Sequence, residues 1–137
     1  MKRDGIYADV DDDARLLTVT VFGDVHDDKA FRDVPAIWRR DPQVAAYDSL
    51  LDLTRDGGRI SWGAIREIAR QWDEFSAGRD HGRHTAVVVR NDQWEAYARV
   101  LATIFPQRVF KTFQSVAAAK LWLASRRDQR VRQMLGG

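Results

Sequence analysis

The sequence contains no cysteine among its 137 residues. Disulfide bonds, a thiol nucleophile and cysteine-rich zinc sites are therefore excluded. The sequence also has no uninterrupted apolar run of about 18 residues, the length that a helix needs to cross a bilayer. Its first twenty residues hold no apolar stretch flanked as in a signal peptide. From these absences we expect a soluble protein of the reducing cytoplasm that does not insert into membranes.

The signatures of common catalytic sites are missing as well. The chain has no Gly-rich phosphate loop, no nucleophile elbow and no pair of carboxylates at catalytic spacing. His81 and His84 could share one face of a helix and bind a metal, but Gly82 between them favours a loop, and no third ligand is evident. We therefore expect a protein that is not an enzyme and that holds neither a metal nor another cofactor.

Glutamate is absent from the first 60 residues, which carry 13 aspartates against nine Lys and Arg side chains, a net charge of −4. The remaining residues carry seven acidic and 13 basic side chains, a net charge of +6. This asymmetry could orient a partner, or it could be a dipolar surface without a role. The basic segment 126–132 lacks interleaved aromatic side chains, so we expect no binding to nucleic acid.

The residues that are present form a clear alternation of strand and helix patterns. Because the chain has the length of one domain, the patterns predict a single α/β domain with a core at about residues 5–125 and a basic C-terminal tail at 126–137. The predicted sheet has five strands and is mixed but largely parallel, with an antiparallel first pair and helices packed against it. The order ββαβαβαβα places strands at 5–10, 15–22, 47–53, 85–90 and 108–111, and helices at 27–40, 61–77, 92–105 and 115–125.

Two features of this pattern carry further expectations. Pro35 lies inside the first predicted helix, where it removes a backbone hydrogen bond, so we expect a kink or a break near Asp33. Three apolar residues, Val131, Met134 and Leu135, continue beyond the last predicted helix. Since two-fold pairing is the commonest assembly of soluble domains, they predict a homodimer.

The chain resembles the SpoIIAA-like family in its order of elements and in three short segments, Leu50-Leu51-Asp52-Leu53, Val109-Phe110 and Ala119-Lys120-Leu121-Trp122-Leu123. These bacterial proteins are related in fold to the STAS domains of anti-sigma factor antagonists and are also likened to Sec14 lipid-binding domains. The resemblance implies a STAS-like fold and a regulatory, protein-binding role. It also implies, as an alternative, a site for a lipid or another small apolar ligand.

In anti-sigma factor antagonists, the helix after the central strand starts with Asp-Ser-Ser-Gly, and its first serine is phosphorylated by the partner kinase. The corresponding segment here is Ile60-Ser61-Trp62-Gly63, which keeps the serine and the glycine but replaces the aspartate and the second serine. The resemblance therefore implies a phosphorylation site at Ser61, where the helix dipole favours an anion. The alternative is that Ser61 only caps its helix.

The end of the central strand and the loop after it define the predicted partner-binding surface. Ligands of open α/β sheets gather near the carboxyl ends of parallel strands, where backbone groups are also available to a partner. Asp52 could equally satisfy backbone donors in this loop. The predicted surface consists of Asp52, Thr54, Asp56, Arg59 and Ser61.

All five tryptophans lie on apolar stripes, which is typical of core residues. If the likeness to Sec14 domains extends to function, an apolar ligand would lie between the sheet and the helices that contain Trp38 or Trp62. The sequence thus leaves two sites open, a protein-binding edge around Ser61 and an apolar pocket beside these two tryptophans.

Overall fold

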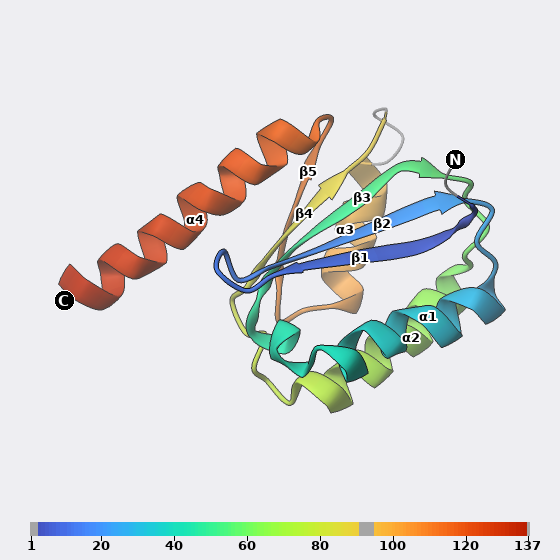
Figure 1. Ribbon diagram of the computed structural model, residues 1–137, viewed down its shortest axis with the longest axis horizontal. Coiled ribbons are helices and arrows are strands. Elements are labelled where there is room, and N and C mark those ends of the chain that lie inside the picture. Colours follow the sequence, from blue (N-terminus) through green and yellow to red (C-terminus); the bar gives the residue numbers. More distant parts are fainter. Residues whose placement is uncertain (1–2, 91–94, 137) are drawn as a thin grey trace.

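The computed structural model describes residues 3–90 and 95–136, with the side chains of 95–98 outside the description. Its elements follow the predicted order, with a 3-10 helix at the short helical turn expected from Asp41-Pro42, and Figure 1 shows them around one sheet. The strands are β1 (Gly5–Asp11), β2 (Leu16–Gly23), β3 (Asp48–Asp56), β4 (His84–Val88) and β5 (Val109–Phe113). The helices are α1 (Asp27–Arg40), η1 (Pro42–Ala46), α2 (Trp62–Ser76), α3 (Glu95–Ile104) and α4 (Val116–Gly136).

The sheet has the order β1-β2-β3-β4-β5, so each strand pairs with its neighbours in the sequence. β1 and β2 are antiparallel, whereas the pairs β2–β3, β3–β4 and β4–β5 are parallel. Each parallel step returns through a helix, as a parallel connection requires. The prediction of one domain with a mixed, largely parallel five-stranded sheet is therefore confirmed.

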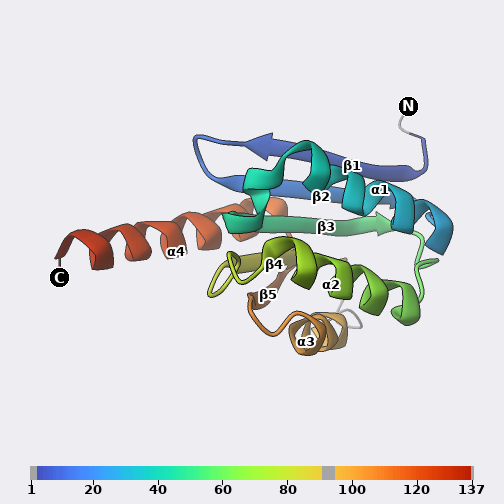
Figure 2. The same ribbon diagram turned by 90° about the horizontal axis from the view of Figure 1, so that it is seen from below.

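Helices cover the two faces of the sheet unequally. In Figure 2, α1, α2 and α3 lie on one side of the strands and α4 lies on the other. On the first side, Leu17 and Val87 pack with Trp38 and Trp72 in the larger core cluster. On the second side, a smaller cluster contains Leu50, Ala86, Val88, Ala119 and Leu123. β4 is covered on both faces, which explains its uninterrupted apolar sequence.

Three elements differ from the sequence prediction. α1 continues through Pro35 without a break, so the expected break was wrong. Pro35 removes only one backbone bond, and its buried ring contributes to packing. β3 extends to Asp56, into the segment predicted as a loop. α4 extends to Gly136, beyond the predicted end at residue 125 and through the predicted tail. The predicted start of the helix at 92–105 and Trp94, one of the five tryptophans expected on apolar stripes, lie outside the described residues.

Candidate functional site

The residues of the predicted partner-binding surface form hydrogen bonds and ion pairs within the chain. Ser61 forms several of these hydrogen bonds. As the sequence predicts, Ser61 caps α2, because its Oγ accepts a hydrogen bond from the backbone N–H of Ala64 at 3.1 Å. Its own N–H and hydroxyl also donate to the two carboxylate oxygens of Asp27, at 2.8 and 2.7 Å. Asp27 lies in the first turn of α1, so this double contact joins the N-termini of two helices.

The Ser61–Asp27 contact works against phosphorylation at Ser61. A phosphate there would bring its negative charge against a carboxylate, which is unfavourable for both groups. The hydrogen bonds from Ser61, led by that of its backbone N–H, lower the pKa of the Asp27 carboxyl and keep it ionised. Arg59, the basic residue of the predicted surface, forms an exposed ion pair in which its Nε lies 3.6 Å from Asp24 Oδ1.

Ser61→Asp is expected to lower the midpoint of thermal unfolding by a few degrees, although aspartate is a good helix cap. The reason is that the new carboxylate can still accept from the Ala64 N–H, but it cannot donate to Asp27 as the hydroxyl does and would face that carboxylate with a like charge. Differential scanning calorimetry of the variant at neutral pH measures this change. Adding Asp27→Asn should restore most of the loss, because an amide can donate to the new carboxylate. An unchanged midpoint for Ser61→Asp would show that Asp27 exerts no effect on this position.

The other residues of the predicted surface are also engaged within the chain. Asp52 Oδ1 accepts hydrogen bonds from the backbone N–H and the hydroxyl of Thr54, at 3.0 and 2.7 Å. Asp56 is buried, and its Oδ1 accepts from the backbone N–H of Gly58 at 3.0 Å. Burial raises the pKa of the Asp56 carboxyl, and the Gly58 hydrogen bond opposes this only in part. These contacts shape the end of β3, and the backbone donor that Asp52 satisfies, Thr54, lies within the strand.

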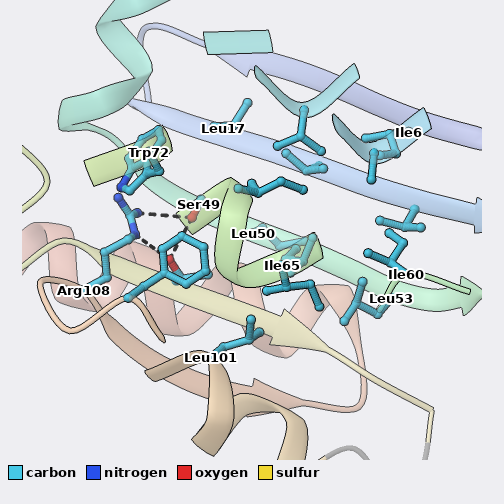
Figure 3. Close-up of a pocket in the computed structure, with 18 of the residues that line it drawn as sticks. Ile6, Leu17, Ser49, Leu50, Leu53, Ile60, Ile65, Trp72, Leu101 and Arg108 are labelled. Carbon is cyan, nitrogen blue, oxygen red and sulfur yellow. Dashed lines mark hydrogen bonds between the residues drawn. The ribbon is translucent and has the colours of Figure 1, made fainter. Parts of the chain in front are cut away.

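A second candidate site is a cavity of about 190 Å³ between the sheet and helices α1, α2 and α3. Figure 3 shows apolar side chains converging on it from the strands and from the helices. Trp38 lines this cavity, as the sequence predicts. Trp62 is not among the lining residues, and it is 37% exposed at the first position of α2. Residues along β3 from Ser49 to Asp56 line it, so the cavity is elongated parallel to the strands.

The cavity has a polar end at Arg108, which is 9% exposed and immediately precedes β5. Its Nε donates to the hydroxyl of Thr85 at 2.8 Å, and its Nη2 donates to the Tyr47 carbonyl and the Ser49 hydroxyl at 2.9 and 3.2 Å. The two hydroxyls also lie within 2.8 Å of each other. The Arg108 guanidinium and the two hydroxyls are therefore hydrogen-bond partners of one another, as the dashed lines in Figure 3 show.

The charge of Arg108 is balanced by Asp80, a carboxylate that is only 1% exposed. Arg108 Nη1 lies 4.0 Å from Asp80 Oδ2, the oxygen that also accepts a hydrogen bond from Trp72 Nε1 at 2.7 Å. Asp80 Oδ1 has no hydrogen-bond partner in the described part of the chain. Burial lowers the pKa of Arg108 to about 10, and the charge of Asp80 opposes this shift. The guanidinium is therefore a costly buried charge that depends on Asp80.

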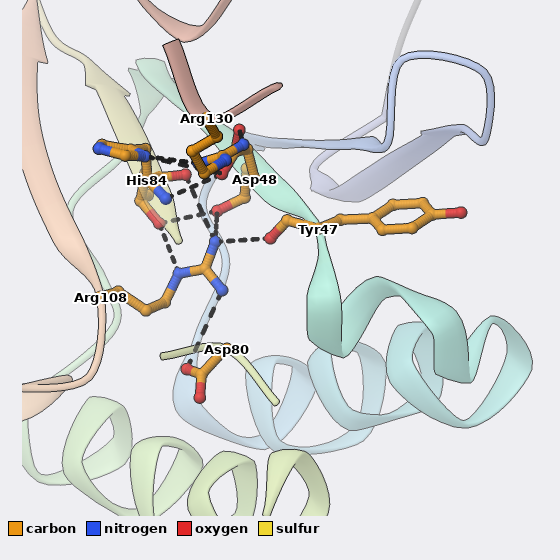
Figure 4. A network of polar contacts seen from close by, with 8 residues as sticks. Tyr47, Asp48, Asp80, His84, Arg108 and Arg130 are labelled. Atoms are coloured by element: carbon orange, nitrogen blue, oxygen red, sulfur yellow. Dashed lines mark hydrogen bonds and ion pairs between the residues drawn. The ribbon is translucent and has the colours of Figure 1, made fainter. Parts of the chain in front are cut away.

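A second polar cluster holds α4 against the other side of the sheet, and Figure 4 shows it together with Arg108 and Asp80. Arg130 of α4 donates to both carboxylate oxygens of Asp48, and its Nη1 lies 2.8 Å from His84 Nδ1. Burial lowers the pKa of His84; the Asp48 carboxylate opposes this, whereas the charges of Arg130, Arg126 and Arg108 add to it. His84 is thus neutral, and its Nδ1 accepts the hydrogen bond from Arg130.

Sequence reasoning missed both arginines. Arg130 lies in the segment predicted to be a solvated tail, and its partner Asp48 is 82 positions away in the sequence. Arg108 begins a predicted strand, and nothing in its sequence neighbourhood indicates burial.

Two kinds of feature are absent from the described residues. No helix there is both long and apolar enough to traverse a bilayer. No group of three or more His, Asp or Glu side chains lies in an arrangement that could hold a metal ion in that part of the chain.

Comparison with known proteins supports the fold. No family model matches the chain, and no curated protein matches it. Among solved structures, it is similar to an uncharacterised protein of the DUF3478 family with a SpoIIAA-like fold, from Shewanella loihica PV-4. The two share 20% sequence identity over 90% of this chain and 97% of the other, with a TM-score of 0.59. The chain is an α/β protein with a SpoIIAA-like fold, as the resemblance in its sequence implied.

Proposed function

We propose that this protein binds a small, uncharged apolar molecule in the cavity between the sheet and helices α1, α2 and α3, and that it does so without catalysing a reaction. The observation that carries this proposal is the cavity itself, about 190 Å³ in volume and lined almost entirely by apolar side chains. Native cores contain few voids larger than a water molecule. An apolar cavity of about 150 Å³ is known to remain dry and to bind benzene.

The polar groups around the cavity define the class of ligand. The Arg108 charge faces Asp80, and the hydroxyls of Ser49 and Thr85 bond to Arg108 and to each other. A charged ligand would lose its hydration without gaining a free counter-charge, which is unfavourable. An aromatic or short aliphatic molecule needs no polar partner and gains from the removal of its surface from water.

The same arrangement supports binding without catalysis. Among the residues that line the cavity, the ionisable side chains are Asp56 and Arg108. They lie towards opposite ends of β3, because Arg108 contacts Ser49 near its start and Asp56 is its last residue. No acid and base are therefore placed to act together on one bound molecule.

Toluene provides a direct test of the proposed site. Saturating toluene is expected to raise the unfolding midpoint of the purified protein by a few degrees, because a ligand that binds only the folded state stabilises it. Binding should also change tryptophan fluorescence, since Trp38 and Trp72 line the cavity. Benzoate, which adds a charge to a similar ring, should have no such effect.

Two variants locate the effect of toluene. Ile65→Phe adds bulk inside the cavity and should abolish the shift, whereas Leu121→Phe adds similar bulk at a side chain that is 73% exposed and should leave it intact. No shift in the wild type, or an equal shift in Ile65→Phe, would reject the proposal. Native mass spectrometry of protein purified from its source cells would then identify the natural occupant of a confirmed site.

A further inference from the structure

Helix α4 is longer than the part of the sheet that it covers. Among the described residues, the last α4 side chain that bonds to the body of the protein is Arg130, which contacts Asp48 and His84. The helix then continues to Gly136, and in both ribbon views this end projects away from the strands (Figures 1 and 2). Six residues of helix span about 9 Å. We call residues 131–136 the α4 overhang.

The α4 overhang carries an apolar stripe. Val131, Met134 and Leu135 are spaced three and four residues apart, so they lie on one side of the helix. Their exposed fractions are 46%, 84% and 83%. One basic side chain, Arg132, lies within the overhang, whereas Arg127 precedes it and donates to the Asp13 carbonyl of its own chain at 3.4 Å.

One side of strands β1 and β2 carries acidic side chains, opposite in charge to Arg132 of the overhang. Thr18 of β2 pairs with Leu50 of β3, and Leu50 packs under α4, so Thr18 lies on the α4 side of the sheet. Asp9 of β1 pairs with Thr18, and Tyr7 pairs with Thr20, which places them on the same side. α4 reaches this side at the turn, where Leu16 packs with the smaller core cluster and Arg127 Nη2 donates to the Asp13 carbonyl at 3.4 Å, whereas Tyr7 and Asp9 further along β1 are exposed. We call this region the β1–β2 face.

The β1–β2 face combines aromatic rings with negative charge. Tyr7 is 36% exposed, and Asp9 and Asp11 are exposed beside it, while Phe22 is half-buried. The turn that follows β1 adds Asp12 and Asp13. The Arg55 guanidinium lies over the Phe22 ring, 6.0 Å from its centroid, so the acidic part of the face is Asp9, Asp11 and the turn. The α4 overhang, by contrast, is apolar and carries the basic Arg132.

We infer that the α4 overhang of one copy packs on the β1–β2 face of a second copy, forming a two-fold homodimer. Val131, Met134 and Leu135 lie against the partner's rings, and Arg132 of the overhang faces the partner's aspartates. In a two-fold dimer, the overhang of each copy packs on the β1–β2 face of the other, so both surfaces of both copies are covered. Pairing of the two α4 helices with each other is less favourable, because it would bring their arginines together. The small area of two overhangs makes the dimer weak, with dissociation in the micromolar range.

Sedimentation velocity across micromolar concentrations tests the dimer. The wild type is expected to shift from monomer to dimer as concentration rises, and Met134→Glu with Leu135→Glu should remain monomeric. Leu121→Glu is the matched control, since Leu121 is 73% exposed on the same helix but outside the overhang. It should dimerise as the wild type does. A wild type that is monomeric at every concentration, or equal loss of the dimer in the control, would overturn the inference.

The absence of cysteine allows a second, positional test. Protein with Met134→Cys is mixed with protein carrying Asp9→Cys under mild oxidation, and non-reducing electrophoresis detects covalent dimers. The mixture should cross-link far more than either variant alone, because the two positions meet only across the interface. Equal cross-linking of Met134→Cys by itself would indicate that the α4 helices pair with each other, which would refute the proposed contact.

Discussion

Replacing Arg108 with methionine is expected to lower the free energy of unfolding by about 3–5 kcal/mol, the usual effect of removing one partner from a buried ion pair. The loss of packing should be small, because methionine fills a similar apolar volume. The main effect comes from Asp80, which is 1% exposed and would have no counter-charge. The hydroxyls of Ser49 and Thr85 would also lose a donor. Urea denaturation followed by circular dichroism measures the change.

A second replacement separates the charge from the packing. In Arg108→Met with Asp80→Asn, the buried charge disappears, while the amide oxygen introduced at position 80 can still accept the hydrogen bond from Trp72 Nε1. The double variant should therefore be more stable than Arg108→Met alone by more than about 1 kcal/mol. If the double variant is no more stable than the single one, the interaction of Arg108 with Asp80 does not explain the effect.

The fold could be predicted because its signals are local. The acidic turn between β1 and β2, the apolar run of β4 and the helical stripe from Ile65 to Phe75 each determine one element from neighbouring residues. The order of these elements then restricts the topology to a small set, since parallel strands require helical crossovers. Ser61 was recognised as a cap for the same reason, because its partner Ala64 is three positions away.

The candidate site could not be predicted in the same way, because its contacts are distant in sequence. Ser61 meets Asp27 over a separation of 34 positions, and Arg108 reaches Ser49 over 59. The spacing of apolar residues in the sequence also cannot show which of Trp38 and Trp62 is buried, since both lie on apolar stripes. Only the packed structure shows that Trp38 is 7% exposed and lines the cavity, whereas Trp62 is 37% exposed.

The end of helix α4 was predicted too early, at residue 125, because the residues that follow are highly charged. The segment 126–132 is rich in arginine, which favoured a solvated helix end within a basic tail. Arginine is nevertheless a good helix former, and its long side chain can reach a partner from an exposed position. Arg130 does so, binding Asp48 at the start of β3. The helix therefore extends through the predicted tail.

Leu101→Ala is the second change with a large expected effect, a loss of about 3–5 kcal/mol in the free energy of unfolding. Leu101 is 4% exposed and lines the cavity from α3. Its truncation enlarges a space that is already present, so the surrounding residues are less able to close over it. The cost should therefore fall in the upper part of the range for such replacements. Chemical denaturation with and without toluene measures both the loss and its recovery.

Leu123→Ala is the matched control, because Leu123 is also 4% exposed but packs under α4 on the opposite side of the sheet. Both variants should be destabilised, since each loses the same buried side-chain atoms. Toluene should stabilise Leu101→Ala more than the wild type, because the enlarged cavity still has apolar walls and can hold the ligand with less strain. It should stabilise Leu123→Ala no more than the wild type. Equal recovery in the two variants would mean that toluene acts at a general hydrophobic surface, and the cavity would then have no special role in binding.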